Sequence, residues 1–268
     1  MNGTRRPIGV FDSGIGGLTV VKALVESLPS ESIIYFGDTA RVPYGTKSKS
    51  TIVKFSLENV EFLLRHDVKC IVIACNTSSS WALPTLRTYF KVPMVGVIRP
   101  GAMAAVQRTR KKRVGVIGTS ATISSRAYEI AIHRIDPTVK VFSQPCPLFV
   151  PLVEEGWLNG TICREVAQRY LTPLRRQRID ALILGCTHYP LLAQTIQSVL
   201  GTEVALVDSA RQTVEEVRGV LMGTEALCDR RLRPRHRFFV TDEPSRFTHL
   251  AHQFLGRVIG SVERANTH

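Results

Sequence analysis

Short apolar runs alternate along the chain with stretches in which apolar residues recur every three or four positions. The runs predict buried strands, and the stretches predict amphipathic helices. In the first part of the chain we expect helices over residues 18–28 and 50–65 and strands at residues 8–11, 32–36, 70–74 and 94–98. Alternating strands and helices of this length predict a parallel sheet with right-handed crossovers.

The same pattern begins again near the middle of the chain. An apolar strand with glycine at its second position starts at Val114 as it does at Ile8, and a hydroxyl-rich turn and a helix follow. Further strands are expected at residues 139–142, 181–184 and 204–207. The fold class is therefore predicted as α/β, with two similar halves that have mainly parallel sheets and are related by a pseudo-twofold. The active site is expected in the cleft between the halves, where the carboxyl ends of the strands meet.

The last part of the chain is expected to pack back onto the first half. It contains predicted helices over residues 209–222 and 244–255 and a predicted strand over residues 238–241. We thus predict a first α/β domain that comprises residues 1–98 and 209–268, and a second that comprises residues 99–208.

Two cysteines stand at matching positions in the two halves. Cys75 follows the apolar run 71–74, and Cys186 follows the run 182–185. Each is expected at the carboxyl end of a strand and the amino end of a helix, where unpaired backbone N–H groups stabilise a thiolate. A single strand-end cysteine is more often a packing residue. The matched pair favours a chemical role.

Two thiols on opposite faces of one carbon can invert it. One thiolate removes a proton, and the opposite thiol returns a proton to the other face of the flat carbanion. Because a thiol is far less basic than the carbanion of an amino acid, oriented donors must stabilise the intermediate. Such donors lie next to the cysteines, at Asn76, Thr77, Thr187 and His188.

The bulk composition is that of an ordinary globular protein of 268 residues, 44% of them hydrophobic. A formal charge of +13 raises nucleic acid as a partner. The basic clusters at residues 108–113, 175–178 and 230–237 lack interleaved aromatic residues, however, and are more typical of solvated faces. Nucleic acid is thus an unlikely partner, although a positive field can speed capture of an anionic substrate.

Location and metal content are also constrained by the sequence. No apolar run approaches the length of a membrane span, and no signal sequence precedes Ile8, so we expect a cytoplasmic protein without membrane association. The six cysteines show no metal-ligand spacing, and we expect reduced thiols and no metal. Four of them lack a counterpart and are expected to be packing residues: Cys70, Cys146, Cys163 and Cys228.

A nucleotide-binding protein is the alternative from another functional class. Gly14 and Gly16 follow a predicted strand, and Asp38 ends the next strand, as in a dinucleotide-binding fingerprint. Thr19 replaces the third glycine, and Asp12 would place a negative charge beside a pyrophosphate.

Four segments resemble motifs of the aspartate/glutamate racemase family, in particular the bacterial glutamate racemases. They are residues 12–17, 37–45, 74–77 and 185–192, in the family's order and over nearly the whole chain. The resemblance implies a two-base racemase that needs no cofactor and no pyridoxal phosphate. It implies D-glutamate production for peptidoglycan, and a homodimer. Aspartate or another acidic amino acid remains the alternative substrate.

The resemblance also implies roles for individual residues. Cys75 and Cys186 are the two bases; Asp12 assists Cys75, and His188 and Glu154 assist Cys186. The residues that hold the substrate are Asp12, Ser13, Pro43, Tyr44, Gly45, Asn76, Thr77, Thr187 and His188. Two of these assignments have plain structural alternatives, because Asp12 could cap the first helix and Glu154, in a Glu-Glu pair, could be solvated.

Overall fold

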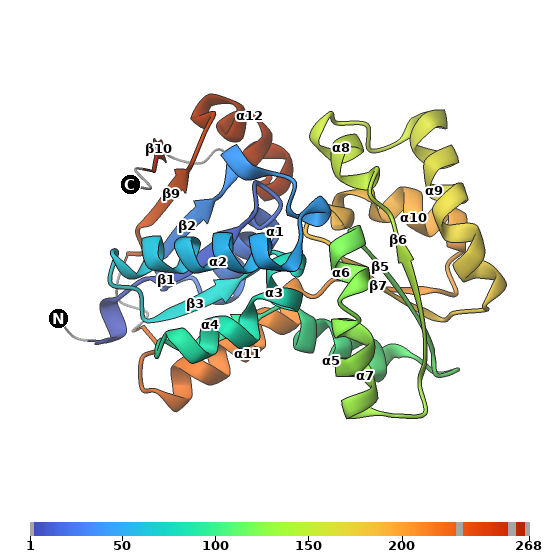
Figure 1. Ribbon diagram of the computed structural model, residues 1–268, viewed down its shortest axis with the longest axis horizontal. Helices are drawn as coiled ribbons and strands as arrows, with labels where there is room; N and C mark the ends of the chain where they lie inside the picture. Colours follow the sequence, from blue (N-terminus) through green and yellow to red (C-terminus); the bar gives the residue numbers. More distant parts are fainter. Residues whose placement is uncertain (1–2, 229–232, 257–260, 266–268) are drawn as a thin grey trace.

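Two α/β halves lie side by side in the computed structural model, each built around its own sheet (Figure 1). The structure describes residues 3–228, 233–256 and 261–265. Within this part of the chain, no helix has the length and apolar character that a membrane crossing requires.

The first sheet has six strands, and all its pairings are parallel. Its strands, from one edge to the other, are β10 (Val262–Arg264), β9 (His236–Val240), β2 (Ile33–Gly37), β1 (Ile8–Asp12), β3 (Cys70–Ile73) and β4 (Met94–Gly96).

The second sheet has four strands, again all parallel. In spatial order they are β6 (Lys140–Pro145), β5 (Arg113–Gly118), β7 (Ala181–Gly185) and β8 (Ala205–Val207). This order matches the order β2, β1, β3, β4 of the first sheet. The prediction of two similar parallel α/β halves is confirmed.

Helices cover the sheets of both halves (Figure 1). Those that pack with the first sheet and its neighbours are α1 (Leu18–Ser27), α2 (Lys49–Leu64), α3 (Asn76–Trp81), α4 (Leu83–Tyr89), α11 (Ala210–Gly223) and α12 (Pro244–Leu255). The others are α5 (Ile98–Arg108), α6 (Ser120–Ser124), α7 (Ala127–Ile135), α8 (Phe149–Glu154), α9 (Gly160–Arg176) and α10 (Ala193–Leu200). Short 3-10 helices are η1 (Gly3–Arg5), η2 (Thr39–Arg41), η3 (Tyr44–Thr46) and η4 (Tyr189–Leu192).

The apolar pattern explains these elements. Every residue of β1, β3 and β7 is buried, as expected for central strands of a parallel sheet that is covered on both faces. Helix α1 buries an apolar stripe that includes Leu18, Val21 and Leu24, while Lys22 on its other face is exposed. The last part of the chain returns to the first half as predicted, because β9 pairs with β2 and α12 packs against α1.

Three strand predictions are wrong at an end by two residues or more. The strand expected to begin at residue 238 begins at His236 as β9. The strand expected to reach residue 98 stops at Gly96, and α5 begins at Ile98. Pro100 lies in the first turn of α5 and does not prevent the helix, because a proline in this turn removes no intrahelical hydrogen bond. Strand β6 runs to Pro145, beyond its predicted end at residue 142; as an edge strand it pairs only with β5, which leaves room for a proline.

Candidate active site

A cavity of about 30 Å³ lies between the two halves and is lined by both matched cysteines. Cys75 follows β3 in the first half, and Cys186 follows β7 in the second. The predicted site residues that line the same cavity are Ser13, Pro43, Tyr44, Gly45, Asn76, Thr77, Glu154, Thr187 and His188. Most of the predicted residues, from segments far apart in the chain, therefore line one cavity.

Three further residues line this cavity that the sequence analysis did not assign to the site: Val42, Thr119 and Val150. The position of Thr119 could have been recognised from the sequence. Thr119 directly follows β5, just as Ser13 directly follows β1, which ends at Asp12, in the other half. Its hydroxyl lies 2.9 Å from that of Thr77, which joins the two halves at the cavity.

Cys75 is the residue before α3, and its thiol is buried. Its Sγ lies 3.6 Å from the hydroxyl of Ser13. Burial, with the negative charge of Asp12, raises the pKa of Cys75 to about 11. The backbone N–H of Ser78, in the first turn of α3, and the hydroxyls of Ser13 and Ser78 lower the pKa of Cys75, as expected for a helix start, but desolvation outweighs them.

Cys186 has a different setting. It is followed by a turn and by the 3-10 helix η4, so the expected α-helix does not begin here. Its Sγ lies 3.8 Å from Nδ1 of His188, and Nε2 of His188 lies 3.1 Å from Oε1 of Glu154. Polar contacts thus connect the thiol of Cys186, through the imidazole of His188, to the carboxylate of Glu154.

The contacts of His188 favour its charged form. Burial opposes a charge on the imidazole, but the hydrogen bonds and charges of Cys186 and Glu154 outweigh burial and raise the pKa of His188 to about 10. Burial likewise opposes the charge on Glu154, and the hydrogen bond and charge of His188 outweigh it and lower the pKa of Glu154. The side chain of Glu154 is only 24% exposed, so its structural alternative, a solvated glutamate, is wrong.

Asp12 ends β1 and is completely buried. It is absent from the lining of the cavity, and its Oδ2 accepts a hydrogen bond from the N–H of Gly14 at 3.0 Å. Burial raises the pKa of its carboxyl group. The first helix begins after Gly17, and the backbone N–H groups of Gly14 and Gly17 favour the charged form of the Asp12 carboxyl group.

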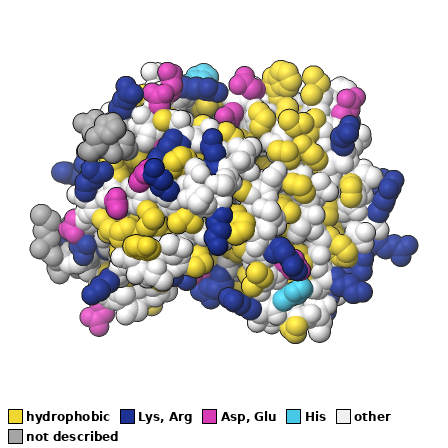
Figure 2. All heavy atoms as spheres, viewed as in Figure 1, with side chains coloured by type: hydrophobic (Ala, Val, Ile, Leu, Met, Phe, Trp, Pro, Cys, Tyr) yellow, Lys and Arg dark blue, Asp and Glu magenta, His cyan; other side chains and the backbone are white. Residues whose placement is uncertain are grey.

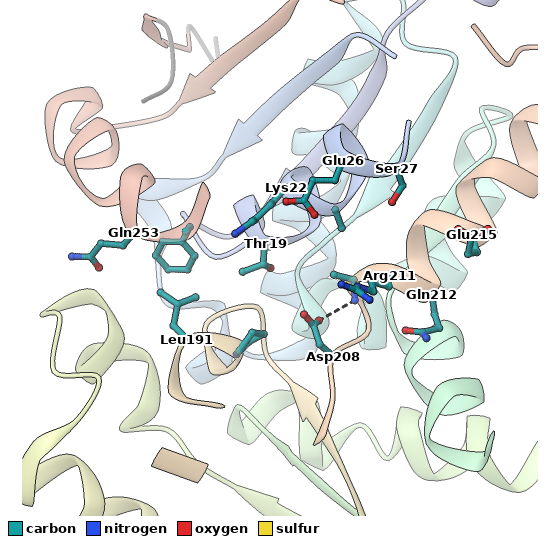
Figure 3. Close-up of a pocket in the computed structure, with 14 residues that line it drawn as sticks. Thr19, Lys22, Glu26, Ser27, Leu191, Asp208, Arg211, Gln212, Glu215 and Gln253 are labelled. Carbon is teal, nitrogen blue, oxygen red and sulfur yellow. Dashed lines mark hydrogen bonds between the residues drawn. The ribbon is translucent and has the colours of Figure 1, made fainter. Parts of the chain in front are cut away.

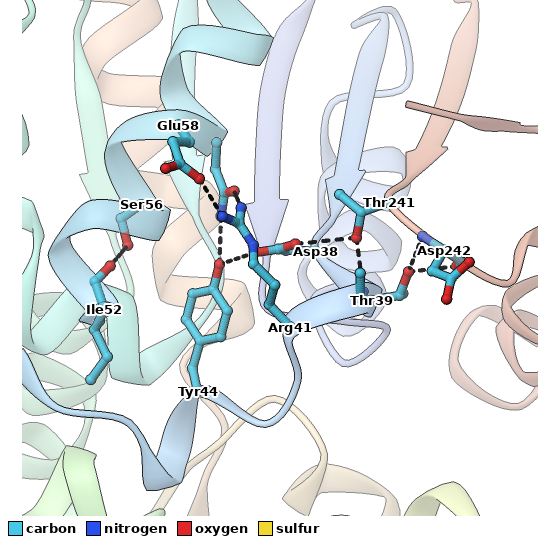
Figure 4. A network of polar contacts seen from close by, with 11 residues as sticks. Asp38, Thr39, Arg41, Tyr44, Ile52, Ser56, Glu58, Thr241 and Asp242 are labelled. Carbon is cyan, nitrogen blue, oxygen red and sulfur yellow. Dashed lines mark hydrogen bonds and ion pairs between the residues drawn. The ribbon is translucent and has the colours of Figure 1, made fainter. Parts of the chain in front are cut away.

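The loop with Pro43, Tyr44 and Gly45 is anchored to the first sheet (Figure 4). The hydroxyl of Tyr44 donates to the buried carboxylate of Asp38, which also accepts from Nε of Arg41 at 2.6 Å and from the hydroxyl of Thr241 at 3.1 Å. Burial and the negative charge of Asp38 raise the pKa of Tyr44. The hydroxyl of Tyr44 is therefore committed to Asp38, which leaves backbone N–H groups of the loop to meet a carboxylate.

The glycine-rich loop after β1 does not leave the space that a dinucleotide needs. A Cβ atom on Gly16 would lie 2.2 Å from Oγ1 of Thr187 and 2.5 Å from Nδ1 of His188. The glycine permits close contact between the two loops that follow β1 and β7. The space beside Gly16 is filled by the side chains of Thr187 and His188.

Some residues of the basic cluster at residues 108–113 contact the protein's own backbone. Arg108 donates to the carbonyl of Leu206 at 2.8 Å, and Arg113 donates to the carbonyl of Gln177 at 2.6 Å. On the face drawn in Figure 2, lysines and arginines are spread over both halves. Residues 230–232 of the third cluster lie outside the described residues.

The remaining cysteines do not line the cavity. Cys70, Cys146 and Cys163 are buried in the hydrophobic core, as expected of packing residues. Cys228 is partly exposed, and its backbone N–H donates to Glu31. Within the described ranges, no three side chains of His, Cys, Asp or Glu gather in a way that could hold a metal ion.

A larger cavity, of about 570 Å³, lies outside this site (Figure 3). Its walls come from α1, η4, α11, α12 and the turn at Asp208. Neither matched cysteine lines it, nor do His188 and Glu154. The chemistry therefore belongs to the small cavity between the halves.

Comparison with known proteins identifies the family of this chain. The family described as Asp/Glu/Hydantoin racemase matches residues 8–217. The glutamate racemase of Geobacter metallireducens is 51% identical over 257 residues, which cover 96% of this chain and 95% of that one.

Solved structures agree as well. Glutamate racemase from Bacillus anthracis aligns with a TM-score of 0.94 at 42% identity, and the enzyme from Francisella tularensis in complex with D-glutamate aligns with a TM-score of 0.92 at 43% identity. Each alignment covers 98% of both chains. With its fold, its paired thiols and these relatives, the chain belongs to the Asp/Glu/hydantoin racemase family.

Proposed function

We propose that this protein is a glutamate racemase that interconverts L- and D-glutamate without a cofactor. The observation that carries the proposal is that Cys75 and Cys186, from opposite halves, line one cavity. Identity of 51% to the glutamate racemase of Geobacter metallireducens supports glutamate as the substrate. The product D-glutamate would serve peptidoglycan synthesis.

In the proposed reaction one cysteine, as a thiolate, removes the α-proton, and the other, as a thiol, protonates the opposite face. Asn76, Thr77 and Thr187 are proposed to donate to the substrate and to its enediolate-like intermediate. Asp12 is proposed to assist Cys75 and to bind the amino group, while His188 and Glu154 assist Cys186.

The raised pKa of Cys75, about 11, constrains this mechanism. In the pocket without substrate, the thiol form of Cys75 is favoured. A bound amino acid brings a positively charged α-ammonium group, and a nearby cation lowers the pKa of a thiol. We therefore propose that substrate binding itself helps to form the thiolate.

We also propose that the chain divides into one domain of residues 1–98 and 209–268 and a second of residues 99–208. The strands of the two sheets support this division. All strands of the first sheet fall in the first set of residues, and all strands of the second sheet fall in the second set. The cleft between them would hold the substrate. A cytoplasmic location remains a prediction from the sequence, and a homodimer remains a prediction from the family resemblance.

The proposal is tested by chiral chromatography of L- and D-glutamate incubated with the purified protein and no added cofactor. We expect each enantiomer to form the other, and Cys75→Ser and Cys186→Ser each to reduce racemisation about a thousandfold or more. In heavy water the product of either enantiomer should gain deuterium before the recovered substrate does.

The control is Cys163→Ser, which changes a buried cysteine in α9 that lies away from the cavity. It should retain activity. Absence of racemisation by the wild-type protein, or full activity in either active-site variant, would contradict the proposal.

A further inference from the structure

Tyr128, in α7 of the second half, reaches across to the first half. Its side chain is buried, and its hydroxyl donates a hydrogen bond to Oδ1 of Asn76 at 2.6 Å. Burial raises the pKa of Tyr128, so the hydroxyl keeps its proton and can donate. Asn76 directly follows Cys75 and lines the cavity.

The ring of Tyr128 also touches the segment that carries the other cysteine. A Cβ atom built on Gly185, the residue before Cys186, would lie 3.0 Å from Cε2 of Tyr128. One buried side chain therefore contacts the neighbour of each cysteine. Displacement of this ring would change the position of one sulfur relative to the other.

Tyr128 lies at the junction of the two halves as well. A Cβ atom on Gly101, in α5, would meet both Cε1 of Tyr128 at 3.1 Å and Cβ of Ser209 at 3.2 Å. Gly101 and Ser209 belong to the two segments, residues 97–112 and 208–235, that join one sheet to the other. The contacts of this one ring thus extend to both connections.

The hydrogen bond also sets the orientation of the Asn76 amide. An amide has one oxygen that accepts and one nitrogen that donates. Because Tyr128 occupies Oδ1 of Asn76, the NH₂ group is the part that remains for the cavity. A donor in this place stabilises a carboxylate or an enediolate, whereas an amide rotated by half a turn would present an oxygen to the anion.

We propose that Tyr128 is a positioning residue for racemisation. It holds the Asn76 amide as a donor toward the substrate and fixes the position of the segment that carries Cys75 relative to the segment that carries Cys186. This inference rests on the proposed function. Tyr128 acts through Asn76 and through the backbone near Gly185, without touching the reacting atoms.

The test is the variant Tyr128→Phe, which keeps the ring and removes the hydroxyl. We expect kcat/KM for either enantiomer of glutamate to fall about tenfold, the effect of one lost hydrogen bond to a group that binds an anion. In an Asn76→Ala background the same substitution should change kcat/KM less than twofold, because its effect passes through that amide.

The matched control is Tyr170→Phe in α9. The hydroxyl of Tyr170 accepts a hydrogen bond from the N–H of Leu148 at 3.3 Å, and Tyr170 is not among the residues of the cavity. This variant also loses one tyrosine hydrogen bond and should keep wild-type kcat/KM. Equal kcat/KM for Tyr128→Phe and wild type, or equal losses with and without Asn76, would overturn the inference.

A second measurement does not depend on turnover. The side-chain amide resonances of Asn76, assigned by their loss in Asn76→Ala, should shift in Tyr128→Phe and stay in place in Tyr170→Phe. Unchanged resonances in Tyr128→Phe would overturn the inference even if the wild-type protein racemised glutamate. An inactive wild-type protein would instead contradict the proposed function, and the resonances would still decide whether Tyr128 holds the amide.

Discussion

The two active-site thiols have different polar neighbours although they occupy matching positions. Cys75 lies beside the hydroxyl of Ser13, and Cys186 lies beside an imidazole that a carboxylate supports. The contacts with Cys186 and Glu154 favour the charged form of His188, whereas burial and the negative charge of Asp12 raise the pKa of Cys75. The two halves of the proposed reaction therefore start from unequal thiols.

Replacement of Glu154 by glutamine should change the pH profile of racemisation. The folded site raises the pKa of His188 to about 10, so the imidazolium is present at neutral pH and is lost as the pH rises toward 10. Glu154→Gln removes a carboxylate that favours the cation, so the loss should occur at lower pH. In a plot of log kcat/KM against pH, we expect the alkaline limb to move to lower pH by about one pH unit.

The control for this prediction is the adjacent Glu155→Gln. The side chain of Glu155 is 66% exposed and lies 3.7 Å from Arg246. Its profile should match that of the wild type. An unshifted alkaline limb in Glu154→Gln would show that the protonation of His188 does not limit the reaction in this range.

At the residue scale, the sequence predicted where the two cysteines lie in the fold better than it predicted the burial and charge around them. Matched strand ends located Cys75 and Cys186, because strand ends follow from the apolar pattern. The raised pKa of Cys75 depends on burial by both halves, which one segment of sequence does not contain. The contact between Tyr128 and Asn76 joins residues 52 positions apart and left no local signal.

At the level of elements, the loops after β1 and β7 interlock. Gly16 of the first loop packs directly on Thr187 and His188 of the second. Most strands and most element bounds were predictable, because central strands are uniformly apolar, but the edge strand β10 was not predicted. The end of the edge strand β6 and the start of α5, which contains a proline, were not predictable. Both depend on which backbone hydrogen bonds the fold leaves unused.

Gly16→Ala should therefore damage the site more than the fold. The added methyl group overlaps Thr187 and His188 and must push the Cys186 loop away. We expect a loss of stability of about 1–3 kcal/mol and a fall in kcat/KM of about a hundredfold, measured by urea unfolding and by racemisation.

Gly219→Ala is the matched control. Gly219 is exposed in α11, and a Cβ atom there meets nothing within 4 Å. It should keep full activity and gain about 1 kcal/mol of stability from helix propensity. Wild-type kcat/KM in Gly16→Ala would contradict the proposed importance of the loop contact.

At the scale of the whole molecule, a buried ion pair joins distant parts of the first half. Nζ of Lys69 lies 2.6 Å from Oε2 of Glu31, and both side chains are at most 3% exposed. Lys69 also donates to the carbonyls of Thr4 and Ala226. The start of the chain, the loop before β2 and the segment after α11 are thereby held together.

Lys69→Met should destabilise the protein by about 3–5 kcal/mol, because it leaves Glu31 buried without its counter-charge. The double variant Lys69→Met/Glu31→Leu should recover much of this loss, as measured by urea unfolding. Arg246→Met, which breaks an exposed pair, should cost less than about 1 kcal/mol. Equal stability of the single and double Lys69 variants would contradict this account of the pair.

The unequal surroundings of the two thiols have a thermodynamic consequence. Mirror-image substrates have the same free energy in water, and both directions cross the same highest barrier. Since kcat/KM reflects the free-energy gap between free reactants and that barrier, it must be identical for the two enantiomers. Any advantage in turnover that the imidazole beside Cys186 confers on one enantiomer must then be matched by a proportional rise in its KM, and the reaction has a net direction only while one enantiomer is in excess, as when its product is consumed.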